Sequence, residues 1–370
     1  MCSGTHPVCP CAHARPHVRC ACAVLHTQCA RVHTHTRTQP EVSSGRPERV
    51  RRSWSGTSAP VLAGRVKPQR AGYILIPMAE SSHEALIADI ASQGVSMLIG
   101  GLDTGKTTMA LQAARQALAN GHRPGLVDAD VGTSTVGPPG CVGLTVFNSD
   151  EDLESLDSPD SLHFVGTISP ARLVLQQVVA TAAMAERARS LGDIVIIDTT
   201  AVASGVAGET LKYHKTELCR PDRIVALQRG EEMEPVVGML RRFLGVEVIT
   251  TPTDPVLMSL SPDERAARRA RAFAQALAPP LGRWKVRPTV FAPTIPVGLN
   301  LGRLDGVLVG VQDSSGACLG LGVLEHEDDT LRVLTNVGEG MTGLRLGSMK
   351  IDLETHEPAM VNLREVMFGV

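Results

Sequence analysis

Short apolar runs alternate with longer segments of helical periodicity through the middle of the chain. The apolar runs, each of a length suited to one strand, cover residues 95–99, 125–127, 194–197, 224–227 and 246–249. The segments with apolar residues at helical spacing cover residues 83–93, 109–120, 171–191 and 234–243. Strands without polar alternation are buried on both faces, as in a parallel sheet covered by helices. The pattern predicts an α/β fold with a mostly parallel sheet, whose functional groups lie at the carboxyl ends of its strands.

The pattern changes near residue 288. From there, β-like runs broken by Gly and Asp follow one another without helical periodicity, at residues 306–311, 318–324, 331–334 and 344–351. This pattern predicts a small all-β domain over residues 286–370. We expect this domain to pack on the α/β domain or to mediate its oligomerisation, and to offer a surface to a protein partner. The α/β domain is then expected over residues 73–285, beginning with a short strand at 73–77 that Pro77 ends.

The first 72 residues differ in composition from the rest. They hold six of the nine cysteines, six of the twelve histidines, and eleven Lys and Arg against two Asp and Glu. Their cysteines are spaced as C-x-C rather than C-x-x-C, and no hydrophobic periodicity supports a metal-closed fold, which disfavours a zinc module. A secretory signal is disfavoured because no continuous apolar segment follows the early charges. We expect disordered, low-complexity sequence or a wrongly assigned start codon, for which Met78 is one alternative.

The remaining residues are acidic. The balance of +9 in residues 1–72 leaves −11 for the remainder, because the whole chain carries −2. That charge argues against a long basic groove along a nucleic-acid duplex, although a contact with a single nucleic-acid end stays compatible with it. Cys141, Cys219 and Cys318 are widely spaced, which suggests a reducing compartment. No apolar run reaches the roughly 18 residues of a membrane span, so we expect a soluble, cytoplasmic protein.

Residues 100–107 fit the pattern G-x-x-x-x-G-K-[ST] and directly follow the first apolar run. In such a P-loop, backbone N–H groups surround phosphate oxygens, the lysine reaches the β- and γ-phosphates, and the hydroxyl ligates Mg²⁺. The motif predicts a nucleoside triphosphate site, against the alternative of a merely Gly-rich turn. The expected nucleotide-binding residues are Gly100, Asp103, Thr104, Gly105, Lys106, Thr107 and Thr108, and Thr107 is also expected at the metal. Without an N-K-x-D motif, ATP and GTP are not distinguished.

Three acidic residues end the strands that should neighbour the P-loop. Asp128 and Asp130 follow the run 125–127, and Asp198 follows the run 194–197. A kinase needs one acid to hold Mg²⁺ or its waters and another to accept the proton of the acceptor hydroxyl. The sequence therefore offers three acids for two roles, metal binding and general base. The alternative for each acid is that it only caps the helix that follows.

Several further motifs stand in a fixed order along the chain. They are V-D-A-D-V-G at 127–132, G-P-P-G at 137–140, F-V-G-T-I-S-P at 164–170, G-V-A-G-E-T-L-K at 205–212 and P-D-R-I-V-A-L at 221–227. Together with the P-loop, they resemble the polynucleotide 5′-hydroxyl kinases, the P-loop RNA kinases of RNA 3′-end, tRNA and ribosomal-RNA processing and their archaeal and bacterial relatives. The segments 308–325, 331–337 and 344–352 are similar to the trailing β domain of that family, so the resemblance covers residues 73–352.

The resemblance implies a P-loop NTPase fold and transfer of the γ-phosphate of ATP to the 5′-hydroxyl end of a short RNA or DNA, with ATP and Mg²⁺ as cofactors. It implies that Lys106 stabilises the transferring phosphoryl group. Asp130 would be the general base for the 5′-hydroxyl, and Asp128 would support the metal shell together with Thr107.

The same family carries arginines on a lid over the phosphates, and residues 261–269 match that segment loosely. They offer Arg265, Arg268 and Arg269, of which Arg265 and Arg269 are expected to be catalytic. Guanidinium groups suit this role because phosphoryl transfer spreads charge over equatorial oxygens. A solvent-exposed basic helix face is the alternative.

Two departures from the family pattern keep a second function open. Thr133 stands where the family usually has glutamine, and residues 198–202 supply no aromatic to stack on the terminal base. Val202 could still pack against the terminal base, but less favourably than a stacked aromatic side chain. The first function is the kinase, favoured by Asp130 and the S-P segment; the second is an ATP-binding regulatory or scaffold protein of the same fold with little or no kinase activity. A chromosome-partitioning type of ATPase is disfavoured because Gly101 stands where that class has a second lysine.

Overall fold

The structure is a computed structural model that describes residues 82–202 and 204–368. The expectations for residues 1–72 and for a strand at 73–77 lie outside these described residues. Five parallel strands form the centre of the sheet in the order β2-β5-β1-β6-β7. Their bounds are β1 Gly94–Gly100, β2 Pro124–Ala129, β5 Ile194–Thr199, β6 Arg223–Gln228 and β7 Glu247–Pro252. The predicted parallel core is therefore confirmed.

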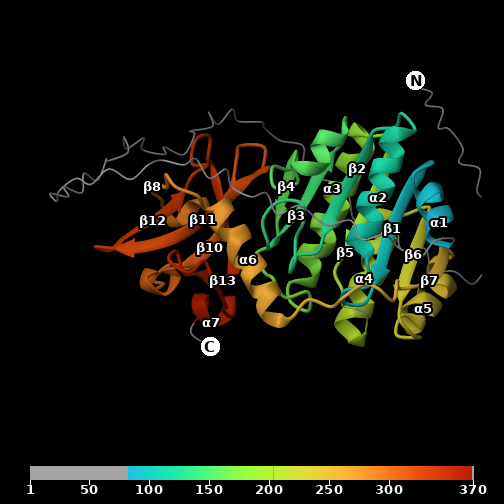
Figure 1. Cartoon of the computed structure of the whole chain (residues 1–370). Coiled ribbons are helices and arrows are strands. Elements are labelled where there is room, and N and C mark those ends of the chain that lie inside the picture. The colour runs from blue at the N-terminus through green and yellow to red at the C-terminus, as the bar shows by residue number, and fades with distance from the viewer. Residues whose placement is uncertain (1–81, 203, 369–370) are drawn as a thin grey trace, which may run out of the picture. The chain divides into compact units, whose positions relative to one another are not determined.

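Helices cover both faces of this parallel sheet (Figure 1). One face packs against α1, Ser82–Ile90, and α2, Lys106–Ala119. The other face packs against α3, Val174–Leu191, α4, Gly205–Cys219, and α5, Glu234–Leu244. Small residues let α2 lie close to the sheet, because its alanines at 110, 113, 114 and 117 are fully buried. Among the described residues, no helix has the length and hydropathy needed to cross a membrane.

An antiparallel pair of strands extends the sheet beyond β2. β3, Cys141–Val146, pairs with β2, and β4, Ser161–Phe164, pairs with β3, with the short 3₁₀ helix η1, Asp150–Glu154, between them. The apolar pattern had not predicted these two strands. β4 then pairs with β11, Cys318–Glu327, through Leu162 and Cys318. The parallel core and the C-terminal strands are thus joined in one sheet.

The C-terminal strands are antiparallel except for one parallel pair, β9 with β13. Their bounds are β8 Gly282–Lys285, β9 Phe291–Ala292, β10 Val307–Gln312, β12 Thr330–Thr335, β13 Gly343–Ile351 and β14 Pro358–Met360. The short helices are η2 Pro288–Val290, η3 Leu301–Leu304 and α7 Leu363–Phe368. These strands enclose a hydrophobic core of their own. The predicted all-β texture is confirmed, and α7 is an addition that the sequence pattern did not predict.

One helix, α6, Pro262–Ala276, connects the end of the parallel core with the C-terminal strands. Its start is defined by a capping box, in which the Ser261 hydroxyl accepts from the Glu264 N–H and the Glu264 carboxylate accepts from the Ser261 N–H. Near its other end, Phe273 is fully buried against residues of β4, β10 and β11. This helix carries the arginines expected on the lid.

Candidate active site

The P-loop joins the end of β1 to the start of α2. A side chain at Gly100 would place its Cβ 2.5 Å from the Leu227 carbonyl oxygen, and Gly105 has a φ of +90°. Both positions require glycine, the first for close approach of two strands and the second for a left-handed backbone. The motif glycines therefore set the path of the loop.

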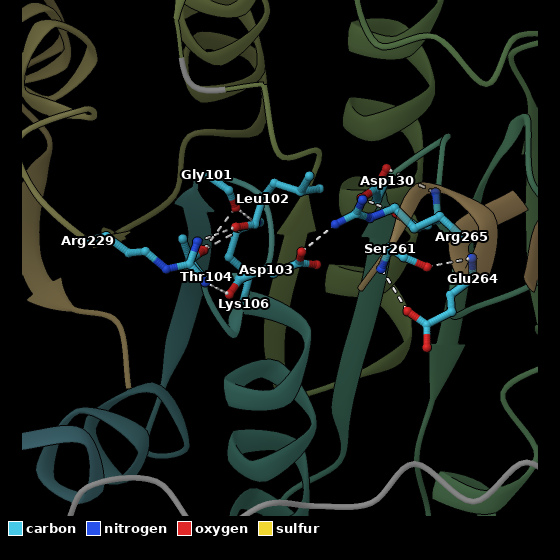
Figure 2. Close-up of polar contacts among 11 residues, drawn as sticks. Gly101, Leu102, Asp103, Thr104, Lys106, Asp130, Arg229, Ser261, Glu264 and Arg265 are labelled. Carbon is cyan, nitrogen blue, oxygen red and sulfur yellow. Dashed lines mark hydrogen bonds and ion pairs between the residues drawn. The ribbon is translucent and has the colours of Figure 1, made fainter. Parts of the chain in front are cut away.

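Lys106 lies inside this loop (Figure 2). Its ammonium donates to the Gly101 carbonyl oxygen at 2.6 Å and lies 3.4 Å from the Thr104 hydroxyl. Burial lowers the pKa of Lys106, whereas the carboxylates of Asp198, Asp130 and Asp103 act in the opposite direction. A buried ammonium interacts more strongly with phosphate oxygens than an exposed one, which suits Lys106 to bind them.

An arginine outside the loop satisfies its carbonyl groups. Arg229, the residue after β6, donates to the Leu102 carbonyl at 3.0 Å and to the Asp103 carbonyl at 2.7 Å (Figure 2). Hydrogen bonds to two successive carbonyls hold the loop in one conformation. Arg229 was not among the residues predicted from the sequence, where the only sign of its role is its position directly after a strand of the parallel core.

Asp198 at the end of β5 faces the start of α2. The Thr107 hydroxyl donates to its Oδ2 at 2.5 Å, while its buried Oδ1 has no hydrogen-bond partner among the described residues. Burial raises the pKa of Asp198, against the effect of the Lys106 ammonium and the Thr107 hydrogen bond. This acid was one of three candidates in the sequence, and the structure brings it to the predicted metal-site residue Thr107.

Asp128 at the end of β2 is engaged by the loop that follows it. Its Oδ1 accepts from the Asp130 N–H at 2.9 Å, and its Oδ2 accepts from the N–H groups of Thr135 at 2.5 Å and Val136 at 3.0 Å. Burial, with the nearby charges of Asp198 and Asp130, raises the pKa of Asp128 to about 7. Both oxygens thus serve the fold of the loop, and a role for Asp128 at the metal stays a prediction.

Asp130 is only half-buried and lies beyond the strand end. Its Oδ1 accepts from the Gly132 N–H at 2.9 Å, and its Oδ2 accepts from the Thr133 hydroxyl at 3.1 Å. Because Asp130 directly follows β2, it lies at the edge of the sheet where Asp128 pairs with Asp198. Thr133, which departs from the family pattern, therefore orients the carboxylate expected to act as general base.

Two buried lysines of α4 lie behind these acids. Lys212 donates to the Thr199 hydroxyl at 2.6 Å and to the Thr200 carbonyl at 2.5 Å, and Lys215 donates to the Ala129 carbonyl at 3.2 Å. Burial lowers the pKa of Lys212 well below its ordinary value and that of Lys215 to about 8. The lysines hold the ends of β2 and β5, a role that was not predicted from the sequence.

The lid arginines approach the P-loop from α6. Arg265 forms an ion pair with the Asp103 carboxylate, with 2.5 Å between Nη2 and Oδ2 (Figure 2). Arg269 lies one turn further along the helix and is half-buried, whereas Arg268 is exposed. The structure thus places Arg265 at the P-loop and directs Arg268 to solvent.

The segment expected to contact the acceptor base follows β5. The Thr199 hydroxyl donates to the Leu98 carbonyl at 2.7 Å, which ties the end of β5 to β1. Val202 lies so close to Gly208 of α4 that a Cβ there would be 2.8 Å from its Cγ1. Val202 is half-buried, so part of its aliphatic surface is available to a ligand.

The site suits a divalent cation that nucleotide phosphates help to hold. Within the described residues, no group of three or more His, Cys, Asp or Glu could hold a metal ion without other ligands. Mg²⁺ is usually bound by one or two protein oxygens together with substrate phosphates and waters. The unpartnered buried oxygen of Asp198 and the Thr107 hydroxyl fit that kind of coordination.

Comparison with known proteins connects this geometry to one family. Residues 100–276 match the family described as mRNA cleavage and polyadenylation factor CLP1 P-loop. The polyribonucleotide 5′-hydroxyl-kinase PH0197 of Pyrococcus horikoshii is 37% identical over 155 residues, which are 41% of this chain and 42% of that relative. The polyribonucleotide 5′-hydroxyl-kinase TK1956 of Thermococcus kodakarensis is 27% identical over 73% of this chain and 92% of that protein. The resemblance predicted from the motifs is confirmed.

A solved structure shows the same fold. A chain in the structure of a wild-type Clp1p–Pcf11p complex superimposes with a TM-score of 0.53 at 14% identity, covering 72% of this chain and 77% of that one. At this identity the likeness concerns the fold alone. The match to PH0197 spans less than half of that relative, whereas the match to TK1956 extends over most of its length.

Proposed function

We propose that this chain is an ATP-dependent polynucleotide 5′-hydroxyl kinase of the Clp1 P-loop family, which residues 100–276 match. It transfers the γ-phosphate of ATP to the 5′-hydroxyl end of RNA or DNA. The observation that carries the proposal is that the P-loop with Lys106 and the acids at the ends of β2 and β5 lie at the same carboxyl edge of the parallel sheet. Relatives named as polyribonucleotide 5′-hydroxyl-kinases support the same activity.

The P-loop binds the triphosphate and holds it for transfer. Lys106 leaves the Gly101 carbonyl, its partner in this structure, and places its ammonium on the β- and γ-phosphates. Arg229 keeps the loop carbonyls occupied, so the loop conformation does not have to form at the moment of binding. When Mg²⁺ is bound, it neutralises phosphate charge, and Thr107 with Asp198 would hold it.

Asp130 accepts the proton of the acceptor hydroxyl. The 5′-oxygen forms a bond to the γ-phosphorus, the bond from that phosphorus to the bridging oxygen of ATP breaks, and ADP leaves. The hydroxyl proton passes to the Asp130 carboxylate, which the Thr133 hydroxyl and the Gly132 N–H hold in place. The half-buried position of Asp130 leaves it within reach of an acceptor, in contrast to Asp128.

The lid arginines stabilise the charge of the transferring group. Arg265 exchanges its ion pair with Asp103 for the equatorial oxygens of the γ-phosphate, and Arg269 supports it from the next turn. Burial of Phe273 fixes the other end of α6, which limits the motion to the first turns of the helix.

The acceptor end is held by aliphatic rather than aromatic contacts. Val202 takes the position where an aromatic side chain would stack on the terminal base. We therefore expect a high KM for oligonucleotides and little preference between bases at the 5′ end.

The proposal is tested with the full chain, γ-labelled ATP, Mg²⁺ and short RNA and DNA oligonucleotides that carry a 5′-hydroxyl. Label on the 5′ end of either oligonucleotide is expected, and an oligonucleotide that already carries a 5′-phosphate is the matched control. If ATP binds and neither oligonucleotide is labelled, the kinase proposal fails. That result would favour an ATP-operated binding protein whose partner contacts the C-terminal strands.

A further inference from the structure

Two lysines of α4 are buried as completely as the aliphatic core. Lys212 and Lys215 are both 0% exposed and stand three residues apart, so their side chains leave the same face of the helix. Burial of an ammonium is unfavourable unless hydrogen bonds compensate for the water that it loses. A methionine or a leucine would fill the same space without that penalty. The donors and charges of these lysines therefore call for a role that an apolar side chain cannot take.

The two ammonium groups bind opposite members of one residue pair in the sheet. Thr199, the last residue of β5, and Ala129, the last residue of β2, are partners in the parallel register. Lys212 donates to the Thr199 hydroxyl at 2.6 Å, and Lys215 donates to the Ala129 carbonyl at 3.2 Å. Both contacts thus lie where the strands end and the two loops of the site begin.

The contact of Lys215 lies directly before the expected general base. Asp130 follows Ala129 in the chain, and the carbonyl oxygen that Lys215 binds belongs to the peptide bond between these two residues. The orientation of that peptide sets the direction in which the Asp130 side chain leaves the backbone. The hydrogen bonds of the Asp130 carboxylate, to Gly132 and Thr133, lie within the loop that follows. The bond from Lys215 connects that loop with α4.

The contacts of Lys212 lie in the acceptor segment, residues 199–202, which contains the side chain expected at the acceptor base. Besides the Thr199 hydroxyl, the Lys212 ammonium binds the Thr200 carbonyl at 2.5 Å. The Thr199 hydroxyl donates in turn to the Leu98 carbonyl of β1, the strand that leads into the P-loop. One chain of hydrogen bonds therefore runs from α4 through the acceptor segment to the strand that carries the P-loop.

The lysines approach the sheet from the face opposite the P-loop helix. Asp198 meets Thr107 of α2, whereas the next residue, Thr199, meets Lys212 of α4. Successive side chains of a strand point to opposite faces of the sheet, so α2 and α4 lie on different sides of these strand ends. A nucleotide at the start of α2 is therefore separated from Lys212 by the sheet itself. Lys212 can act on the reaction only through the groups that it holds.

We propose that Lys212 and Lys215 are positioning residues that align the two sides of the transfer reaction. Lys212 sets the acceptor segment relative to the P-loop strand, and Lys215 sets the loop that begins with Asp130. The inference rests on the proposed function for the roles of Val202 and Asp130. It adds that one helix, α4, holds the acceptor and the general base through two separate contacts, so that loss of each lysine impairs a different step.

Steady-state kinetics of the full chain at saturating ATP and Mg²⁺, with a 5′-hydroxyl RNA as the varied substrate, test this division of roles. Lys212→Met is expected to raise KM for the RNA about tenfold and to change kcat by less than about threefold, because misplaced acceptor contacts weaken binding. Lys215→Met is expected to lower kcat by about tenfold or more at an unchanged KM, since a displaced general base slows the transfer step. Titration with ATP gives the concentration of active sites, so a smaller folded fraction cannot imitate a loss of kcat.

Thr216→Val is the matched control on the same helix. Thr216 is also buried on α4, and its hydroxyl lies 3.8 Å from the Sδ atom of Met97 in the middle of β1, away from both strand ends. A general loosening of α4 on the sheet would therefore appear in this variant too. We expect its KM and kcat to stay within about twofold of wild type. If the methionine variants do not fold, Lys212→Gln and Lys215→Gln, whose side chains are one bond shorter, take their place.

Hydrogen exchange of the same variants gives a readout that does not depend on phosphoryl transfer. Loss of Lys212 is expected to speed amide exchange on the order of tenfold in residues 199–202 and to leave residues 130–136 unchanged, and loss of Lys215 is expected to do the reverse. If the wild-type chain labels no polynucleotide, the proposed kinase fails, and exchange alone still decides whether each lysine holds its own segment.

Several results would overturn the inference. Changes of KM and kcat that are the same in both lysine variants, or a comparable loss in Thr216→Val, would mean that the lysines only stabilise the fold. Wild-type kinetics in both lysine variants would show that neither residue positions a reacting group. Exchange that stays unchanged in both segments, or that rises equally in both, would contradict two separate contacts.

Discussion

The ends of β2 and β5 lie side by side and each carries an aspartate, yet the two acids do different work. Asp128 and Asp198 are paired in the register of the sheet. Every oxygen of Asp128 accepts N–H groups of the loop after β2, whereas Asp198 keeps one buried oxygen without a partner in the described chain and meets Thr107 with the other. The comparison teaches that the role of an acid at a strand end depends on the path of the chain beyond it.

That path differs for a simple reason. After β2 the chain turns back within eight residues, and its N–H groups at 130, 135 and 136 close around Asp128. After β5 it continues toward α4, where Lys212 holds Thr199 and Thr200 rather than Asp198. The free oxygen of Asp198 is therefore available for a ligand, whereas both oxygens of Asp128 already accept backbone N–H groups.

At the end of the site that contains Asp198, we expect the loss of Lys106 to reduce the rate of phosphoryl transfer most. Lys106→Ala is expected to reduce the transfer rate on the order of 1,000-fold, because it removes the cation that stabilises the transferring phosphoryl group. A steady-state assay with labelled ATP measures it, and circular dichroism confirms that the fold is retained. A variant with near wild-type activity would mean that the P-loop does not hold the reacting phosphates.

On the predicted lid helix α6, Arg265 contacts the P-loop and Arg268 is exposed to solvent. Arg265→Ala is expected to slow transfer by about a few hundred-fold. The loss is smaller than for an arginine that acts alone, because Arg269 shares its role. Arg268→Ala, on the exposed side of the same helix, should leave the rate within about twofold. Comparison of kcat for both variants decides whether α6 acts as a lid; equal effects would contradict it.

Asparagine at each of the two paired acids tests the comparison directly. Asp198→Asn is expected to reduce activity roughly 100-fold and to weaken the dependence on Mg²⁺, with little change in stability. Asp128→Asn should lower the free energy of unfolding by about 1–3 kcal/mol, since the amide nitrogen cannot accept the backbone N–H that one carboxylate oxygen accepts. Urea denaturation and Mg²⁺ titration of activity measure both. The opposite assignment of effects would make Asp128 the metal ligand.

The smallest expected effect is a pH dependence of stability that comes from Asp128. Its pKa rises from 3.8 to about 7 in the folded protein, so between these values the folded state holds a proton that the unfolded state has lost. Stability contributed by this group therefore falls as the pH rises from about 4 to 7. Asp128→Asn should flatten the change in urea midpoint between pH 5 and pH 7. An unchanged slope would show that Asp128 remains charged in the fold.

Much of the fold followed from the sequence because its signals are local. The apolar runs and the P-loop glycines predicted β1, β2, β5, β6 and β7 to within a few residues. α4 was missed because Lys212 and Lys215 are buried, which hides the apolar face of the helix from a pattern of hydrophobic residues. β3 and β4 were missed because Gly143 and Thr145 interrupt the apolar run of β3, and β4 is a short strand with only two apolar residues.

Other site residues could not be assigned a role from the sequence, because their roles depend on contacts between residues far apart along the chain. Thr107 and Asp198 are 91 residues apart, and Arg229 is 126 residues from the Asp103 carbonyl that it holds. Spacing along the chain cannot reveal such pairs, since strand order decides them. The motif residues of the P-loop, in contrast, could be named from their pattern alone.

The most direct test of the account is the rate of one round of transfer in Asp130→Asn. With ATP and Mg²⁺ in saturating amounts and the full chain in excess over a 5′-hydroxyl RNA, single-turnover transfer is expected to be on the order of 100- to 10,000-fold slower than in wild type, because the general base is lost. ATP affinity, measured on the same preparation, should be unchanged. A variant that transfers phosphate at the wild-type rate would contradict the account, because the carboxylate would then have no part in activating the hydroxyl.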